Sequence, residues 1–251
     1  MLFPQKSVWK GLDCGMLEPN NIYLGDCYEL IKQIPDKSID LVYTDIPYLL
    51  EKGGFSKTKL GNRLRKISKE LYPIMDGIDY SILDELCRVS KHIYIYIWCS
   101  VKQIKDLLNY FDGKARVNIL VWCKTNPAPM TGDMWLPDME YCLCFKGKGS
   151  PRYNDGYDIK HHYFISKTNK SDKDIYYHPT IKPLEMVKNH LKHSSNEGDI
   201  ILDPFCGSGT TLKACQELNR KYIGMEINEQ YYKIAKDRLN NINAKGEVSL
   251  F

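Results

Sequence analysis

Residues 200–209 read Ile200-Ile201-Leu202-Asp203-Pro204-Phe205-Cys206-Gly207-Ser208-Gly209, an apolar run that ends at an acid and continues into two glycines. The apolar part predicts a buried strand, and residues 210–218 have helical spacing. A strand, a glycine turn and a helix in this order are typical of the ligand-binding edge of a doubly wound α/β sheet. The glycines leave room for the backbone to approach a ligand closely.

An acid follows at the tip of the next predicted strand. Glu226 stands 17 residues past Gly209, where a carboxylate can accept hydrogen bonds from ribose hydroxyls. Position 212 is Leu, so the third glycine of a dinucleotide-binding G-x-G-x-x-G motif is missing. The turn therefore indicates an adenosine pocket for a ligand without a pyrophosphate, such as S-adenosylmethionine (AdoMet). Asp26, after the first strand, is either an adenine contact or a helix N-cap.

Strand and helix patterns alternate along most of the chain. They predict a single α/β domain over residues 1–251, with one doubly wound, mostly parallel seven-stranded sheet. The expected strands are 21–24, 39–44, 93–98, 117–122, 140–145, 198–202 and 221–225. The expected helices are 27–34, 80–89, 101–110, 184–193, 210–218 and 229–240. Two irregular, basic insertions are expected at about 49–77 and 125–177, and long insertions of this kind usually have a function.

The composition excludes few functions. Lys and Arg number 35 against 31 Asp and Glu, a mild excess that permits nucleic-acid binding without arguing for it. We expect a cytoplasmic protein, because the N-terminus does not resemble a signal peptide and no apolar run is long enough to span a membrane. The nine cysteines are scattered without a C-x-x-C pair, and the six histidines lack companion ligands. We therefore expect reduced thiols and no metal site.

A second distinctive stretch, Thr44-Asp45-Ile46-Pro47-Tyr48, follows the apolar residues 39–43. A carboxylate, two adjacent backbone carbonyls and an aromatic ring at a strand end can together hold a flat ring that bears an amino group, such as a nucleobase. Taken alone, the Asp and the Pro could simply terminate the strand. The interpretation as a nucleobase site is favoured only when this stretch is considered together with the glycine turn.

Together the two stretches resemble those of the β-type, circularly permuted AdoMet-dependent DNA amino-methyltransferases, the N6-adenine/N4-cytosine family, in which the catalytic tetrapeptide precedes the cofactor turn. The resemblance covers about residues 20–240. Supporting matches are Gly25-Asp26-Cys27, residues 35–41, Trp122-Cys123-Lys124, Asn126-Pro127 and His178-Pro179-Thr180-Ile181-Lys182-Pro183. The one departure is Ile46, where the family usually has proline. Ile46 keeps its carbonyl acceptor and is confined to extended conformations by Pro47.

The resemblance implies three sets of site residues. The catalytic set is Asp45, Ile46, Pro47 and Tyr48. The cofactor-binding set is Asp26, Thr180, Lys182, Asp203, Phe205, Gly207, Ser208, Gly209, Thr210 and Glu226. Basic residues of the two insertions and their borders would contact DNA phosphates; they are Lys52, Lys57, Lys59, Arg63, Arg65, Lys124, Arg152 and Lys160.

The expected reaction is transfer of a methyl group from AdoMet to the exocyclic amine of a base flipped out of double-stranded DNA. By resemblance, Asp at position 45 favours N6 of adenine over N4 of cytosine. A short recognition sequence is expected, read by the insertions or by a homodimer. The alternatives are an RNA or protein amide methyltransferase and a catalytically silent nucleic-acid-binding partner; Leu212 disfavours a nicotinamide-dependent dehydrogenase. The sequence leaves open whether the role is restriction–modification or regulation.

Overall fold

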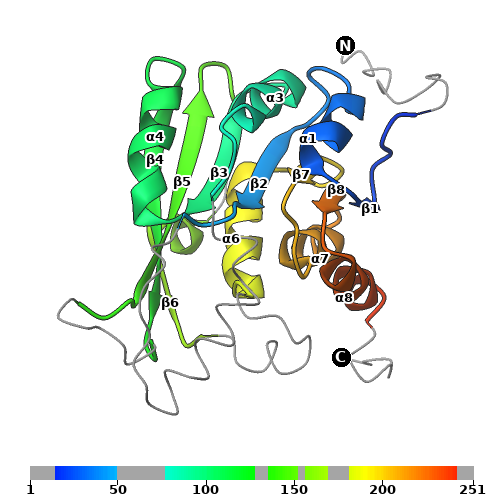
Figure 1. The fold of residues 1–251 in the computed structure, drawn as a ribbon. Helices are drawn as coiled ribbons and strands as arrows, with labels where there is room; N and C mark the ends of the chain where they lie inside the picture. The colour runs from blue at the N-terminus through cyan, green and yellow to red at the C-terminus, as the bar shows by residue number, and fades with distance from the viewer. Residues whose placement is uncertain (1–14, 50–76, 128–134, 152–155, 169–180, 242–251) are drawn as a thin grey trace.

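The structure is a computed structural model that describes residues 15–49, 77–127, 135–151, 156–168 and 181–241. Its eight strands are β1 (Asn21–Leu24), β2 (Leu41–Asp45), β3 (Tyr94–Cys99), β4 (Ala115–Lys124), β5 (Met139–Gly147), β6 (Tyr163–Ser166), β7 (Ile200–Asp203) and β8 (Lys221–Glu226). They form one sheet in the order β1-β8-β7-β2-β3-β5-β4-β6 (Figure 1). Only β5 runs antiparallel to its neighbours. The predicted α/β class with a mostly parallel sheet is confirmed.

The prediction of seven strands is wrong by one. The eighth strand, β6, lies within the segment 125–177 that the sequence indicates as an irregular insertion. It is short and its side chains are exposed or half-buried, so it leaves no continuous apolar pattern. Strand β5, which corresponds to the expected strand 140–145, lies in the same segment and pairs with both β3 and β4. Much of this segment is therefore part of the sheet, and it is not an irregular insertion throughout.

Helices cover both faces of the sheet (Figure 1). Their bounds are α1 Cys27–Leu30, the 3₁₀ helix η1 Ile31–Gln33, α3 Ile82–Val89, α4 Val101–Phe111, the 3₁₀ helix η3 Tyr157–Ile159, α6 Leu184–Ser194, α7 Thr210–Glu217 and α8 Glu229–Leu239. One core cluster joins the sheet to α1, η1, α3 and α4, and a second joins its other face to α6 and α7. In the described residues, no helix has the length and apolar character needed to cross a membrane.

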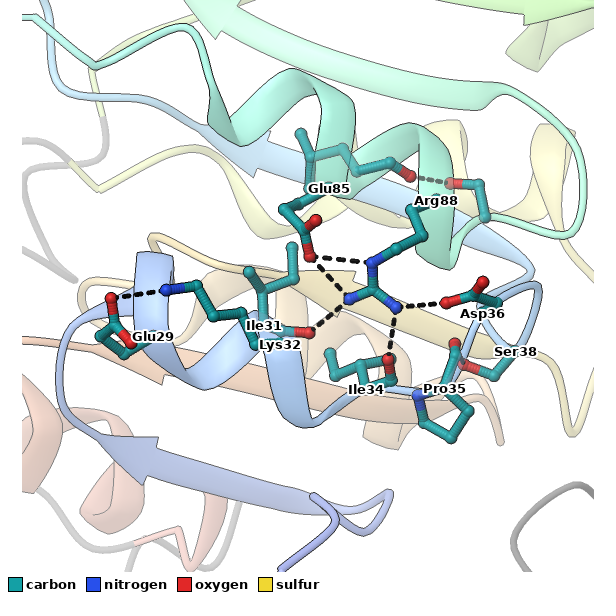
Figure 2. A network of polar contacts seen from close by, with 11 residues as sticks. Glu29, Ile31, Lys32, Ile34, Pro35, Asp36, Ser38, Glu85 and Arg88 are labelled. Carbon is teal, nitrogen blue, oxygen red and sulfur yellow. Dashed lines mark hydrogen bonds and ion pairs between the residues drawn. The ribbon is translucent and has the colours of Figure 1, made fainter.

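Arg88 of helix α3 forms hydrogen bonds and ion pairs with residues 31–36, which connect β1 to β2 (Figure 2). Its guanidinium donates hydrogen bonds to the carbonyl oxygens of Ile31 and Ile34, both at 2.9 Å. It also forms ion pairs with Glu85 at 2.7 Å and with Asp36 at 2.5 Å. The last carbonyls of a helical segment lack partners within the helix. Arg88 supplies a donor to the Ile34 carbonyl and a second donor to the Ile31 carbonyl, which also accepts from Ile34 N at 3.0 Å. The network links the segment before β2 to α3.

Strands β2 and β7 pair at the middle of the sheet, with Leu41 opposite Ile201 and Val42 opposite Leu202. From β2 the sheet continues through β3 on one side, and from β7 it continues through β8 on the other. This is a topological switch point, where open α/β sheets bind ligands beyond the carboxyl ends of the strands. The pairing brings the ends of the two distinctive stretches, Asp45 and Asp203, to the same edge.

Candidate active site

A cavity of about 380 Å³ lies beyond the carboxyl ends of β1, β2, β7 and β8. Residues from both distinctive stretches line it, although more than 150 positions separate them in the sequence. Among the predicted site residues, those lining the cavity are Asp26, Asp45, Ile46, Pro47, Tyr48, Lys182, Asp203, Phe205, Gly207, Ser208, Thr210 and Glu226. The chain therefore forms one continuous pocket from the two stretches that the sequence singles out.

Glu226, at the end of β8, is held by two backbone amides. Gly207 N donates to Oε2 at 2.9 Å, and Asn228 N donates to Oε1 at 2.8 Å. The side chain is nearly buried, and burial raises the pKa of Glu226. Each carboxylate oxygen still has a free lone pair. Glu226 can thus accept hydrogen bonds from two hydroxyls of a ligand in the cavity, as a ribose requires.

Gly209 plays a different part from the one expected. Its φ is +75°, and an added Cβ would lie 3.0 Å from Ala235 Cβ and 3.3 Å from Ala235 Cα. The neighbour is therefore helix α8, and Gly209 is absent from the cavity lining. The glycine is required by the turn and by close packing of α8, so the expectation that it makes room for a ligand does not fit this position.

The other residues of the cofactor set line the cavity with part of their hydrogen-bonding capacity already used. Asp26 accepts from Tyr28 N at 3.0 Å as the N-cap of α1, so it is an N-cap and a wall of the cavity at once. Thr210 Oγ1 accepts from the buried Arg238 at 2.7 Å. Asp203 accepts from Phe205 N at 3.2 Å, and burial raises the pKa of Asp203 to about 7. These contacts fix the shape of the turn around the pocket.

The second stretch is anchored to the sheet and to the start of α4. Ile46 is 2% exposed and belongs to a core cluster, so only its backbone is available to a ligand. Gln103 Nε2 donates to the Pro47 carbonyl at 2.9 Å, and Ser100 Oγ donates to the Leu49 carbonyl at 3.1 Å. Of the two carbonyls expected to face a ligand, that of Pro47 already has a protein partner.

Lys182 lies at the catalytic stretch. Its Nζ is 2.6 Å from Asp45 Oδ2, 2.9 Å from Glu140 Oε2 and 3.1 Å from the Tyr48 hydroxyl. An ammonium has three N–H donors, and three acceptors of the protein occupy them. This leaves no donor for a cofactor carboxylate. The structure thus places Lys182 against Asp45 and Tyr48 of the second stretch, in contrast to the expected contact with the cofactor.

The charges of this cluster stabilise one another. Burial alone would lower the pKa of Lys182, but the carboxylates of Asp45 and Glu140 outweigh it and raise that pKa. Burial acts to raise the pKa of Glu140, but Lys182 and Lys124 together lower it to about 2. Burial raises the pKa of Asp45 more than Lys182 lowers it. The cluster therefore holds Lys182 and Glu140 in their charged forms.

Asp45 keeps acceptor capacity beside the cavity. Its side chain is 29% exposed, and Oδ1 is buried without a hydrogen-bond partner among the residues that the structure describes. A buried acceptor without a partner costs about 1–3 kcal/mol, and a charged acceptor costs more. Such an atom is explained by a functional role or by bound solvent. Asp45 is therefore suited to accept hydrogen bonds from an amino group in the pocket.

Sequence reasoning misses Glu140 and Gln103. Each comes from an element without a recognisable motif, and the signal that Glu140 offers is an acid at the start of a buried strand, where an unpaired charge is costly. Lys124, expected at DNA, instead forms an ion pair with Glu140 at 2.7 Å and is 16% exposed. Lys160 follows η3, away from the cavity. The remaining predicted residues lie outside the described ones: Lys52, Lys57, Lys59, Arg63, Arg65, Arg152 and Thr180.

Known proteins resemble this chain over most of its length. The sequence model of the DNA methylase family, N6/N4 type, matches residues 39–237. The Type II methyltransferase M2.LlaDCHI of Lactococcus lactis subsp. cremoris is 29% identical over 86% of this chain and 87% of its own length. The Type II methyltransferase M.HpaI of Haemophilus parainfluenzae is 33% identical over 84% and 71%. The structure of the M1.HpyAVI–SAM complex aligns with a TM-score of 0.64 and 26% identity, over 87% and 98%. The matched residues include both stretches of the pocket.

Proposed function

The chain belongs to the DNA methylase family of N6/N4 type, and we propose that it methylates N6 of adenine, within a short specific sequence of double-stranded DNA. The cofactor is S-adenosylmethionine. The chain is thus a DNA amino-methyltransferase, and the finer proposal concerns its base. The observation that carries it is the carboxylate of Asp45, with an unpaired oxygen, in one cavity with Glu226.

The residues around the glycine turn fit the cofactor. Glu226 offers two oriented acceptors for ribose hydroxyls, Phe205 offers an apolar ring, and Asp26 lies across the cavity as the candidate adenine contact. When bound, S-adenosylmethionine supplies an electrophilic methyl group on a sulfonium whose leaving sulfur is neutral. The protein must therefore chiefly align the acceptor and neutralise developing charge, and it needs no strong base.

Asp45 and the Ile46 carbonyl would receive the amine. The lone pair of an exocyclic amine is delocalised into the base, which makes the nitrogen a poor nucleophile. Hydrogen bonds from its two N–H groups to Asp45 and Ile46 favour a pyramidal nitrogen and offset the positive charge that develops on it. Tyr48 would stack on the base, which leaves the duplex to enter the cavity. The Tyr48 ring is restrained because its hydroxyl contacts Lys182.

The finer features of the proposal rest on sequence order and residue type. Asp45-Ile46-Pro47-Tyr48 precedes the glycine turn, which is the β-type order. An aspartate at the first position supports adenine over cytosine by resemblance to that family. We propose that residues 49–77 and parts of 125–177 contact DNA and select the sequence, and that two chains can pair on one recognition site.

The test is transfer from labelled S-adenosylmethionine to DNA, RNA and protein supplied separately. We expect label in double-stranded DNA alone, and sequencing of modified positions should report N6-methyladenine in one short sequence. N4-methylcytosine in that assay would overturn the choice of base while retaining the family activity. Label in RNA or protein with none in DNA would overturn the proposed substrate. Cofactor binding without transfer to any acceptor would identify a silent binding partner.

A further inference from the structure

Glu140 is absent from both motifs, yet it lies at the centre of the charged cluster beside the cavity. Its Oε2 is 2.9 Å from Lys182 Nζ, and its Oε1 is 2.7 Å from Lys124 Nζ. Charges of opposite sign therefore alternate in the order Lys124, Glu140, Lys182 and Asp45. Glu140 itself reaches the Tyr48 hydroxyl at 3.4 Å. Strands β2, β4 and β5 and the segment before α6 thus meet at four side chains joined by three ion pairs.

We infer that Glu140 and Lys182 are positioning residues for the proposed methyl transfer: Glu140 fixes the ammonium of Lys182, and Lys182 fixes Asp45 Oδ2 and the Tyr48 hydroxyl. This inference rests on the function proposed above. A lysine side chain is flexible, and the last torsion of an aspartate is broad. Hydrogen bonds from the Lys182 ammonium to both carboxylates restrain the lysine side chain and the last torsion of Asp45. They therefore set the direction in which Asp45 presents its remaining lone pairs.

The same geometry fixes the electrostatic neighbourhood of Asp45. Lys182 favours its ionised form and Glu140 opposes it. The other titratable groups that interact with Asp45 are Tyr48, which follows β2, Asp203 on β7, Cys99 on β3, Cys142 on β5 and Tyr43 on β2. Burial raises the pKa values of the two thiols and of the two tyrosines, so these four are neutral near pH 7. Asp203, with its pKa near 7, is the one group of these that titrates there.

Two single variants and their combination test the inference in the full chain, with the DNA that the wild type methylates. Lys182→Met should lower kcat by about 10²-fold, the cost of a small misplacement of a reacting group. Glu140→Gln should lower kcat by about tenfold, because Lys182 loses one anchor. If Glu140 acts through Lys182, the double variant should be no slower than Lys182→Met alone. KM for S-adenosylmethionine should change less than about twofold in all three.

The pH profile of kcat separates positioning from mere folding. Ionised Asp45 accepts the amine N–H more strongly than its protonated form and offsets the positive charge that develops, so activity falls as pH falls through the pKa of Asp45. Loss of the ammonium in Lys182→Met raises that pKa and moves the acid limb to higher pH. Loss of the negative charge in Glu140→Gln lowers it and moves the limb to lower pH.

The control is Lys91→Met, which breaks a 2.7 Å ion pair between Lys91 and Asp40 at the other end of β2 and should leave kcat unchanged. Lys182→Arg serves if Lys182→Met does not fold, and it should keep the acid limb in place while lowering kcat. Losses that add in the double variant, or acid limbs that move in the same direction, would overturn the inference. A wild type that methylates no DNA would instead overturn the proposed function.

Discussion

Arg88 and Lys182 bind aspartates before and at the end of strand β2, and they do so differently. Arg88 binds Asp36, which precedes the strand, and Lys182 binds Asp45, which ends it. Arg88 uses its remaining donors on backbone carbonyls and on Glu85, and Asp36 has a 72% exposed side chain (Figure 2). Lys182 is 7% exposed, and its partner Asp45 keeps a buried oxygen without a described partner.

The difference separates a network whose donors all have protein partners from one that keeps an unpaired acceptor beside the cavity. Around Arg88, the donors meet acceptors of the protein and one partner is solvated, so the arrangement stabilises the crossover with little left for a ligand. Around Lys182, the ammonium is buried and therefore desolvated. Asp45 Oδ1 still has no hydrogen-bond partner among the described residues. Buried charges that are incompletely paired cost stability, and such strain is typical of sites that complete their interactions with a substrate.

The largest expected effect is the loss of methyl transfer when Asp45 is removed, and removal of Asp36 is the comparison. Asp45→Ala should lower methyl transfer by about 10³-fold or more, because it removes an oriented charge that stabilises the transition state. S-adenosylmethionine affinity should stay largely intact, since Glu226 and Phe205, the proposed cofactor contacts, line the other part of the cavity. Asp36→Ala, at the exposed end of the Arg88 network, should leave transfer unchanged. Transfer assays with calorimetric cofactor titration check both; equal losses of binding and transfer in Asp45→Ala would contradict its role.

The second prediction concerns the two cations. Removing Arg88 should lower stability and leave kcat unchanged, whereas removing Lys182 should lower kcat. Arg88→Met should lower the free energy of unfolding by about 2 kcal/mol, because it removes the side-chain donor to the Ile34 carbonyl, one of two donors to the Ile31 carbonyl, and partly exposed ion pairs. Urea unfolding would measure the loss. The kcat of the folded fraction should equal that of the wild type. A fall in kcat without a fall in stability would show that the two networks are coupled across β2.

The fold could be predicted because its elements carry local patterns. The apolar runs of β2, β3 and β7 and the periodic residues of α3 and α4 determine their structure within a few positions. Strand β6 could not be predicted in the same way, because it pairs with a single neighbour, β4, and leaves Tyr163 and Ile165 largely exposed. A short strand of this kind is stabilised by pairing that the sequence does not display.

The site could be predicted where its residues are contiguous. Asp45, Tyr48, Phe205 and Glu226 belong to stretches whose order and spacing indicate chemistry, and all of them line the cavity. Glu140 could not be found in this way, because its role depends on pairing between β5 and β3, which brings a strand start to the pocket. Lys182 lies in a recognised motif, but its partners follow from tertiary packing, which a motif does not specify.

The smallest expected effect concerns a neutral anchor of the catalytic stretch. Gln103 donates to the Pro47 carbonyl and also forms the capping box of α4 with Ser100. Gln103→Leu should lower kcat by about fivefold and stability by about 1 kcal/mol, since it removes the hydrogen bond to Pro47 and the two that Ser100 donates to Gln103 Oε1. Gln216→Leu on α7, where the side chain of the exposed glutamine contacts only Lys213 among its described hydrogen bonds, is the matched control and should change neither. If Gln103→Leu instead raised kcat, the Pro47 carbonyl would be an acceptor for the substrate that Gln103 withholds, and the anchor would have to be reinterpreted as a competitor.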